Sequence, residues 1–287
     1  MASEDAASDL IASARRTAAN ARTRFDYETR RAERHERLAG EGRSDAVTDM
    51  HLRMAAIHRR TAACHLTAAR LQDDYVARLV RWAVHPDARM PRFMAGVAEA
   101  CGTRSAAVTL IGASLDQLAL AASDEPARAA EELEFLLGEG PARDATSELR
   151  PVLADGPALL ERYPGYGPAV AELGIKAVAA VPLSVSGTCV GALAVFDPEQ
   201  GVADADTFDG VAEALTRSVI LGPDGDPALY GATDMRAEVH QAAGMVSVHL
   251  ECPVADALQL IKAHAFAEGV AAHSIAERIL SGELRFD

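Results

Sequence analysis

The chain has 287 residues, and at about 150 residues per domain this length predicts roughly two domains with room for a third, smaller piece. Apolar residues make up 49% of the chain and charged residues 24%, a mixture that argues against a disordered protein and predicts buried cores. The formal net charge of −14 argues against broad, sequence-independent binding to nucleic acid or to anionic lipid.

The cysteines indicate a reducing compartment and no metal site. The chain has Cys64, Cys101, Cys189 and Cys252, with no Cys-x-x-Cys pair and no cysteine–histidine spacing of the kind that zinc requires. Their even number leaves a disulfide pair open, but the first nine residues are acidic and lack the apolar region of a secretory signal. We therefore expect reduced thiols, a cytoplasmic location and no bound metal.

One uncharged stretch resembles a membrane span. Residues 177–196 run for 20 residues without a charge, which is nominally enough to cross a bilayer. Its centre, Val181-Pro-Leu-Ser-Val-Ser-Gly-Thr-Cys189, carries a proline and a Ser-Gly turn between β-branched residues. This punctuation is typical of two strands of a hairpin. The sequence therefore predicts a soluble protein with no membrane partner.

Residues 1–85 have the pattern of an antiparallel helical hairpin that forms a coiled coil. After a glycine-containing break at residues 40–43, apolar residues alternate at spacings of four and three, as in a heptad seam: Met50, Met54, Ile57, Thr61, Cys64, Ala68, Leu71 and Tyr75. Before the break, alanines dominate a second seam of the same rhythm. His51, His58 and His65 share one helix face, as polar flanks of the seam or as a pH-sensitive stripe. The hairpin is also a candidate for pairing with its twin in a homodimer.

Residues 86–221 predict an α+β domain with a mostly antiparallel sheet and flanking helices. The turn-rich stretch between residues 151 and 174 predicts a long loop of the kind that often covers a pocket. Tyr163, Tyr166 and Val185 are the candidate ligand-binding residues, chosen by loop position alone. The predicted strands are Ser105–Ile111, Gln117–Ala122, Ala177–Val185 and Thr188–Phe196, and the predicted helices are Pro91–Cys101, Ala127–Leu137 and Thr207–Ile220.

Residues 222–232 are rich in glycine and proline and predict a short linker. Residues 233–287 then predict a three-helix bundle, with helices over Asp234–Glu251, Pro253–Glu268 and His273–Leu284. A unit of about 50 residues buries too little apolar surface to be comfortably stable alone. We therefore expect these helices to pack against a partner.

The sequence carries no catalytic motif. It lacks a phosphate-binding GxxxxGK[ST] loop, a GxGxxG turn, a GxSxG nucleophile elbow and an HExxH helix. No nucleophile, base and orienting group can be named together, so we expect no enzyme and identify no catalytic residue. No motif identifies a cofactor.

Several runs together resemble a known pair of domains. Leu133-Glu-Phe-Leu-Leu-Gly-Glu-Gly-Pro141, Val181-Pro-Leu183 and Val190-Gly-Ala-Leu-Ala-Val-Phe196 resemble the GAF sensor domains of bacterial antiterminator regulators. Residues 234–280 resemble the ANTAR domain that follows them, with Gln241-Ala-Ala-Gly-Met-Val246 at the first-helix pattern. The order of the two domains supports both halves of the resemblance.

The resemblance implies a signal-responsive regulator of transcription antitermination. An ANTAR domain of this family is a three-helix module that binds paired RNA stem-loops as a dimer and prevents a terminator from forming. A GAF domain implies a sensor of a small ligand or a protein signal. Because RNA is commonly held through basic side chains near its backbone, the expected RNA-binding residues are Lys262, His264, Arg278 and Arg236.

A second interpretation stays open beside this one. Ala243 stands where the family usually has a lysine, and residues 226–287 hold nine acidic and four basic side chains, a balance of −5. Few phosphate contacts are available to such a surface. The alternative is a sensor and interaction protein whose C-terminal helices mediate dimerisation or partner docking without RNA.

Overall fold

The computed structural model describes residues 2–42, 44–84, 89–112, 116–185, 187–198, 205–220 and 234–286, so the predicted linker at residues 222–232 lies outside the described residues. The chain divides into two compact units. The helical unit comprises Met1–Cys101 and Gly201–Gly231, and the sheet unit comprises Gly102–Gln200 and Ala232–Asp287.

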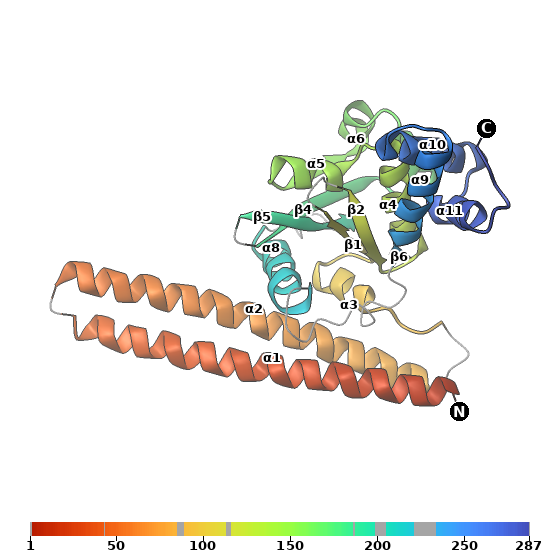
Figure 1. Cartoon of the computed structure of the whole chain (residues 1–287). Coiled ribbons are helices and arrows are strands. Elements are labelled where there is room, and N and C mark those ends of the chain that lie inside the picture. The colour runs from red at the N-terminus through yellow and green to blue at the C-terminus, as the bar shows by residue number, and fades with distance from the viewer. Residues whose placement is uncertain are drawn as a thin grey trace. The chain divides into compact units, whose positions relative to one another are not determined.

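The helical unit is built on two long helices, α1 (Ala2–Gly40) and α2 (Asp45–Val84), which lie side by side as a hairpin (Figure 1). Ala14, Ala18 and Ala32 of α1 are buried at their contact. Because alanine has a small side chain, it allows the two helix axes to approach closely. The predicted helical hairpin is therefore present, and its α1 seam is the alanine seam read from the sequence.

The predicted seam of α2 is wrong in its first half. Met50 and Ile57 are 50% and 56% exposed, whereas Ala55, His58 and Ala62 are buried. Further along α2, Cys64, Ala68, Leu71 and Tyr75 are buried as predicted. Because the alanines of α1 allow a close approach, little room remains for methionine or isoleucine opposite them. The face of α2 that packs against α1 therefore consists of small residues and histidine.

Of the three histidines on this face of α2, His58 is buried and is therefore not a polar flank. The His58 ring nitrogen Nδ1 lies 2.5 Å from Glu28 Oε2 of α1, and the Nδ1 atoms of His35 and His51 lie 3.0 Å apart across the hairpin. These pairs give the Nδ1 atom of each ring a partner where the helices meet, whereas His58 Nε2 is buried without a hydrogen-bond partner among the described residues. His58 and His51 thus help to hold α2 in register with α1.

Three shorter elements complete the helical unit: α3 (Phe93–Ala100), α8 (Ala205–Ala214) and a π-helical segment (Leu215–Ile220). Phe93 of α3 packs edge-on against Tyr75 of α2, with ring centroids 5.7 Å apart. The sequence predicts a single helix over Thr207–Ile220, but its last six residues widen into π geometry, a change that periodicity does not reveal.

The sheet unit contains an antiparallel sheet in the order β3-β4-β5-β1-β2-β6, which confirms the predicted α+β class. Five strands come from the central region, and the sixth is a two-residue strand just before the C-terminal helices. The four predicted strands have the predicted bounds. The strands are β1 (Ser105–Ile111), β2 (Gln117–Ala122), β3 (Val152–Asp155), β4 (Ala177–Val185), β5 (Thr188–Phe196) and β6 (Asp234–Met235).

Alternate residues of these strands form one buried face, as the period of two requires. Val178 and Ala180 of β4 and Ala194 and Phe196 of β5 belong to one core with side chains of four short helices. These helices are α4 (Glu125–Leu137), α5 (Pro141–Glu148), α6 (Gly156–Arg162) and α7 (Tyr166–Glu172).

The predicted long loop between residues 151 and 174 is wrong. The segment contains β3, α6 and α7 instead, and Tyr163 and Tyr166 are buried in the core just described. Its glycines and prolines, which suggested a loop, stand at the ends of the short helices. Pro157, for example, occupies the first turn of α6, where a missing N–H costs nothing.

The C-terminal helices are α9 (Ala237–His249), α10 (Val254–Glu268) and α11 (Ala272–Leu280), and they lie beside α4 (Figure 1). Gly269 ends α10 in the left-handed conformation (φ 66°), which glycine adopts without strain. The first helix starts three residues later than predicted because Asp234 and Met235 pair with β2. The third ends four residues earlier than predicted, at Leu280.

Two further findings bear on the sequence expectations. All four cysteines are free of disulfide bonds. In the parts of the chain that the structure describes, no helix is both long enough and apolar enough to cross a bilayer.

Candidate functional site

Phe135 of α4 joins the central sheet region to the C-terminal helices. Its side chain is 7% exposed and belongs to the apolar core of those helices, together with Val239 of α9, Ile261 of α10 and Ile275 of α11. A buried aromatic side chain contributes a large apolar area to such a core. Within the sheet unit, α4 therefore acts as a fourth helix of the C-terminal bundle.

Arg236, at the start of α9, is completely buried at this junction. Its Nε donates to Gln117 Oε1 and its Nη2 donates to Glu132 Oε2, both at 2.7 Å. Its guanidinium carbon lies 4.2 Å from the centroid of the Phe135 ring. The other oxygen of Glu132 accepts the backbone N–H of Ala272 at 2.7 Å, so one carboxylate pairs with Arg236 and caps α11.

Lys262 of α10 lies on the same aromatic ring. Its Nζ is 3.9 Å from the Phe135 ring centroid, and the residue is 8% exposed. Burial, with smaller effects of the Arg143 and Arg236 guanidinium groups, lowers the pKa of the Lys262 ammonium to about 8. The aromatic ring stabilises the cation by its quadrupole but does not neutralise its charge.

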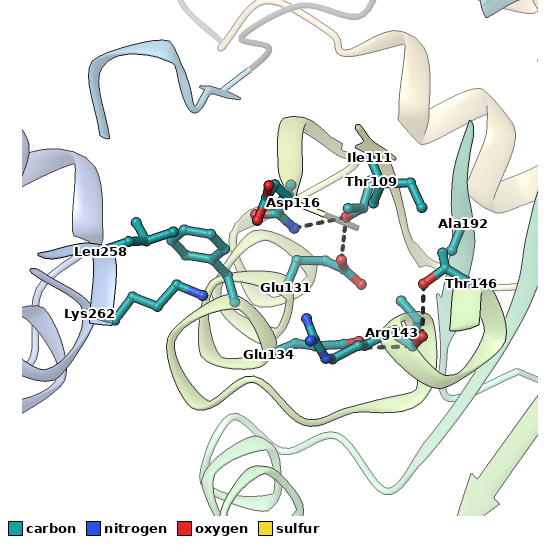
Figure 2. Close-up of a pocket in the computed structure, with 13 residues that line it drawn as sticks. Thr109, Ile111, Asp116, Glu131, Glu134, Arg143, Thr146, Ala192, Leu258 and Lys262 are labelled. Atoms are coloured by element: carbon teal, nitrogen blue, oxygen red, sulfur yellow. Dashed lines mark hydrogen bonds between the residues drawn. The ribbon is translucent and has the colours of Figure 1, made fainter. Parts of the chain in front are cut away.

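A cavity of about 60 Å³ lies next to these contacts (Figure 2). Its walls come from strands β1, β2 and β5, from helices α4 and α5, and from α10 of the C-terminal helices. A cavity of this size has room for about four water molecules or one small molecule. Among the side chains that line it are Thr109, Gln117, Glu131, Arg143, Leu258 and Lys262.

Glu131 is the most unusual lining residue. It is 1% exposed, and its Oε2 accepts the Thr109 hydroxyl at 2.5 Å, while Gln117 Nε2 donates to the Thr109 oxygen at 3.2 Å. Its Oε1 is buried with no hydrogen-bond partner among the described residues. Burial raises the pKa of Glu131 to about 7, against the opposing effects of Thr109 and Arg236.

Glu134, one helical turn further, has a structural role. Its carboxyl oxygens accept the backbone N–H groups of Ala142 and Arg143 at the start of α5. Gly140 leaves the space that this side chain occupies. Burial and the charge of Glu131 raise the pKa of Glu134 well above its ordinary value, although the two backbone N–H groups favour its ionised form.

Burial and the charges of Glu134 and Glu131 raise the pKa of Tyr166 well above its ordinary value, so this predicted ligand-binding residue lies near two carboxyl groups that line the cavity. Tyr163 and Tyr166 lie together, with ring centroids 6.1 Å apart, and the Tyr163 hydroxyl donates to Asp144 Oδ2 at 2.8 Å. Val185 is the last residue of β4. None of the three is among the residues that line the cavity.

The four predicted RNA-binding residues divide into two pairs. Arg236 and Lys262 are covered by α4, as described above. His264 Nε2 and Arg278 Nη1 both contact the carboxylate of Glu268, at 2.7 and 2.6 Å, and each of these two side chains is 33% exposed. The four residues predicted to bind RNA therefore do not form one accessible basic surface in this structure.

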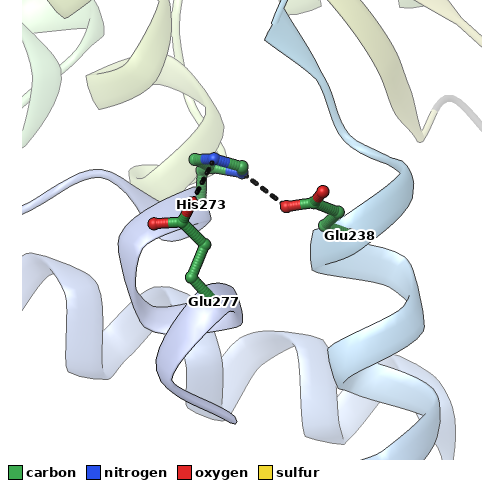
Figure 3. A group of neighbouring side chains, drawn as sticks. All are labelled: Glu238, His273 and Glu277. Atoms are coloured by element: carbon green, nitrogen blue, oxygen red, sulfur yellow. Dashed lines mark ion pairs between the residues drawn. The ribbon is translucent and has the colours of Figure 1, made fainter. Parts of the chain in front are cut away.

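A cluster on the C-terminal helices contains Glu238 of α9 with His273 and Glu277 of α11 (Figure 3). The His273 ring nitrogens Nδ1 and Nε2 lie 3.3 Å from Glu238 and Glu277, respectively. A metal ion is bound by one nitrogen of an imidazole ring. Here each ring nitrogen faces a different carboxylate, so the two carboxylates lie at opposite sides of the ring. We interpret the cluster as a polar bridge between α9 and α11.

The sequence analysis missed Thr109, Gln117 and Glu131. A usable signal was present in α4, because Glu131 and Glu134 follow Ala127 and Ala130 at the spacing of one helix face. The buried alanines of that face carry the two glutamates into the interior. The family motif in this region begins at Leu133, so it includes Glu134 and leaves out Glu131.

Comparison with known proteins adds one finding. Residues 85–219 match the GAF domain family, and the match does not extend to the C-terminal helices. The search of curated proteins found no match to the chain. The central part of the resemblance is therefore confirmed: the chain contains a GAF domain at residues 85–219, which suggests a role in small-molecule sensing or signalling.

Proposed function

We propose that the protein is a signal-responsive regulator in which the GAF cavity is the sensor and the C-terminal helices are the output. The output is binding of paired RNA stem-loops, as in transcription antitermination. The resemblance of residues 234–280 to ANTAR domains supports this assignment. In this proposal the chain acts in the cytoplasm as a homodimer and has no catalytic role.

One observation carries the proposal. The cavity takes part of its wall from the sensor and part from the output, because Glu131 of α4 and Lys262 of α10 both line it. A molecule in the cavity therefore touches both elements. We call the C-terminal helices docked when they pack on α4 and undocked when they are released from it. A bound molecule shifts the equilibrium between the two arrangements whenever its affinity for them differs.

In this proposal RNA binds to the undocked arrangement, because two of the expected RNA-binding residues are covered in the docked one. Lys262 and Arg236 lie against Phe135 when the helices are docked. Undocking exposes both cations, and each additional phosphate contact strengthens RNA binding. The ion pair between Arg236 and Glu132 thus favours the form that does not bind RNA.

The burial of Arg236 and Lys262 is also consistent with a second candidate function. If Arg236 and Lys262 serve only to hold the C-terminal helices on α4, the output is dimerisation or docking of a partner protein without RNA. The −5 charge of residues 226–287 favours this alternative, because it offers few phosphate contacts.

The variant Glu132→Ala separates the two candidates. It removes the carboxylate that pairs with Arg236 and caps α11, so the undocked population rises. We expect the full-length variant to bind an RNA with two adjacent hairpins at least about 10-fold more tightly than the unmodified chain, the effect of about 1.4 kcal/mol in the docking equilibrium.

The matched control is Glu125→Ala, on the exposed first turn of the same helix, which should leave RNA affinity unchanged. Adding Lys262→Ala and Arg278→Ala to Glu132→Ala should reverse the gain. Failure of every variant to bind RNA at low salt removes the RNA proposal and leaves the docking alternative.

A further inference from the structure

The cavity contains two kinds of uncompensated group. Two cationic side chains, Lys262 and Arg143, line it together with the buried carboxyl of Glu131. Figure 2 shows these three side chains around one space, with Lys262 on the α10 side and Glu131 on α4. The interaction partner that each of these groups lacks indicates which charges and hydrogen-bond donors a ligand of this cavity carries.

The cations lack a fixed anion. Among the described residues, no carboxylate forms an ion pair with the Lys262 ammonium or the Arg143 guanidinium, and Lys262 has the face of Phe135 as its close neighbour. Asp116 and Glu134 also line the cavity, and Glu132 lies nearby. Asp116 and Glu132 affect the pKa of Lys262 less than burial does, and the Glu134 carboxyl accepts the backbone N–H groups of Ala142 and Arg143. A ligand carboxylate at this position supplies the missing charge and accepts hydrogen bonds from both cations.

The carboxyl of Glu131 lacks a donor. One of its oxygens is used by Thr109, and the other is buried without a partner. Leaving a buried acceptor unsatisfied is costly, so a ligand that brings an N–H donor gains from this oxygen. An ammonium group does so best, because its charge favours the ionised form of this carboxyl, which burial disfavours.

Size limits the choice further. The volume of about 60 Å³ holds about four water molecules, which excludes a nucleotide and suits a molecule of six or seven non-hydrogen atoms. Resting on the proposed sensing function, we infer that the cavity binds a small zwitterionic α-amino acid, with its carboxylate toward Lys262 and Arg143 and its ammonium toward Glu131.

A zwitterionic ligand in this position favours the docked arrangement of the C-terminal helices. The amino acid connects Lys262 of α10 to Glu131 of α4, so it binds the docked arrangement more tightly than the undocked one. Its binding holds the C-terminal helices on α4 and keeps Arg236 covered. Loss of the amino acid is then the signal that releases the output.

The test is calorimetry of the full-length chain with glycine, L-alanine and L-serine as probes. Propionate and ethylamine, which each carry only one of the two charges, serve as half-ligands. We expect at least one amino acid to bind and each half-ligand to bind at least about 10-fold more weakly, because each loses one charged contact. Equal binding of propionate and L-alanine, or no binding of any of the three amino acids, overturns the inference.

Two substitutions test the assigned ends of the site. Lys262→Met should weaken amino acid binding at least about 10-fold by removing the cation. The matched control is Lys176→Met, which changes the other lysine of the chain, an exposed one. Glu131→Gln should weaken L-alanine and leave propionate unchanged. Unchanged affinity in Lys262→Met, with its thermal melt intact, contradicts the inference.

The outcomes distinguish this inference from the proposed function. An amino acid that binds a chain unable to bind RNA confirms the ligand and rejects the RNA output. A Glu132→Ala variant with gained RNA affinity, in a chain that binds none of the amino acids, supports the output and rejects the ligand class.

Discussion

Lys262 of α10 and Phe135 of α4 form a cation–aromatic contact, with the lysine nitrogen 3.9 Å from the ring centroid. Arg236 contacts the same ring at 4.2 Å. One aromatic side chain from the GAF domain thus contacts two of the basic residues of the C-terminal helices. This shared contact makes Phe135 the first target for substitution.

Replacing Phe135 with alanine should remove a core residue of the C-terminal helices. We expect Phe135→Ala to lower the free energy of unfolding by about 3–5 kcal/mol, the usual cost of deleting a buried aromatic ring. Hydrogen exchange should rise most in α9, α10 and α11 and least in β4 and β5. The control, Leu153→Ala at a 57% exposed position of β3, should cost little. Uniform exchange across the sheet unit would contradict the role given to Phe135.

Lys262 should titrate near pH 8. The chain has two lysines, so ¹³C-methylation of the lysine amines gives two side-chain NMR signals besides that of the N-terminus. The Lys262 signal should move with a midpoint near 8, whereas the signal of the exposed Lys176 serves as the reference.

The same shift has a consequence for stability. Between the folded pKa of about 8 and the ordinary value of 10.5, the unfolded chain binds more protons at Lys262 than the folded chain. The contribution of this residue to the free energy of unfolding therefore rises with pH across that window. The difference in the free energy of unfolding between the unmodified chain and Lys262→Met, measured by denaturant titration at several pH values, should show this rise.

Glu131 should give the opposite slope at lower pH. Its pKa is raised from 4.5 to about 7, so the folded chain binds more protons there than the unfolded chain between these values. The stabilising contribution is complete below pH 4.5 and is lost as the pH rises through 7. Urea titrations should detect this loss in the unmodified chain and a weaker one in Glu131→Gln. Glu172→Gln, at an exposed position of α7, is the control that should keep the original slope.

Gly191 of β5 should tolerate no side chain. A Cβ at this position meets the backbone carbonyl oxygen of Thr109 in the paired strand β1. We expect Gly191→Ala to cost at least about 3 kcal/mol, the upper part of the range for overpacking, because strand backbones cannot move apart without losing hydrogen bonds. Gly244→Ala in α9, where no atom lies within 4 Å of the new Cβ, should instead stabilise the helix by about 0.5–1 kcal/mol. Thermal melts of the two variants compare them directly.

Local patterns were sufficient for much of the fold. Apolar runs closed by turn residues predicted the bounds of β1, β2, β4 and β5. The alanine seam of α1 is likewise a local signal. The GAF domain followed from runs of residues that lie mostly in these strands and in α4.

Patterns failed where a distant residue decides which side is buried. Met50 and Ile57 look like seam residues by hydrophobicity, but the small side chains of α1 select the alanine face of α2. The segment from residue 151 to residue 174 looks like a loop by composition, but β3 pairs with β4 and so becomes a strand. In each case the deciding partner is far along the chain.

The candidate site shows the same division. The amino-acid sequence alone determined that the chain has strands, helices and a GAF domain, since these depend on neighbouring residues and on repeating patterns. Only the tertiary structure placed Phe135 among the C-terminal helices, buried Arg236 and Lys262 against it, and left one oxygen of Glu131 without a partner beside a cavity. Burial of a charged side chain depends on residues brought together by folding, and no local pattern of charges contains that information.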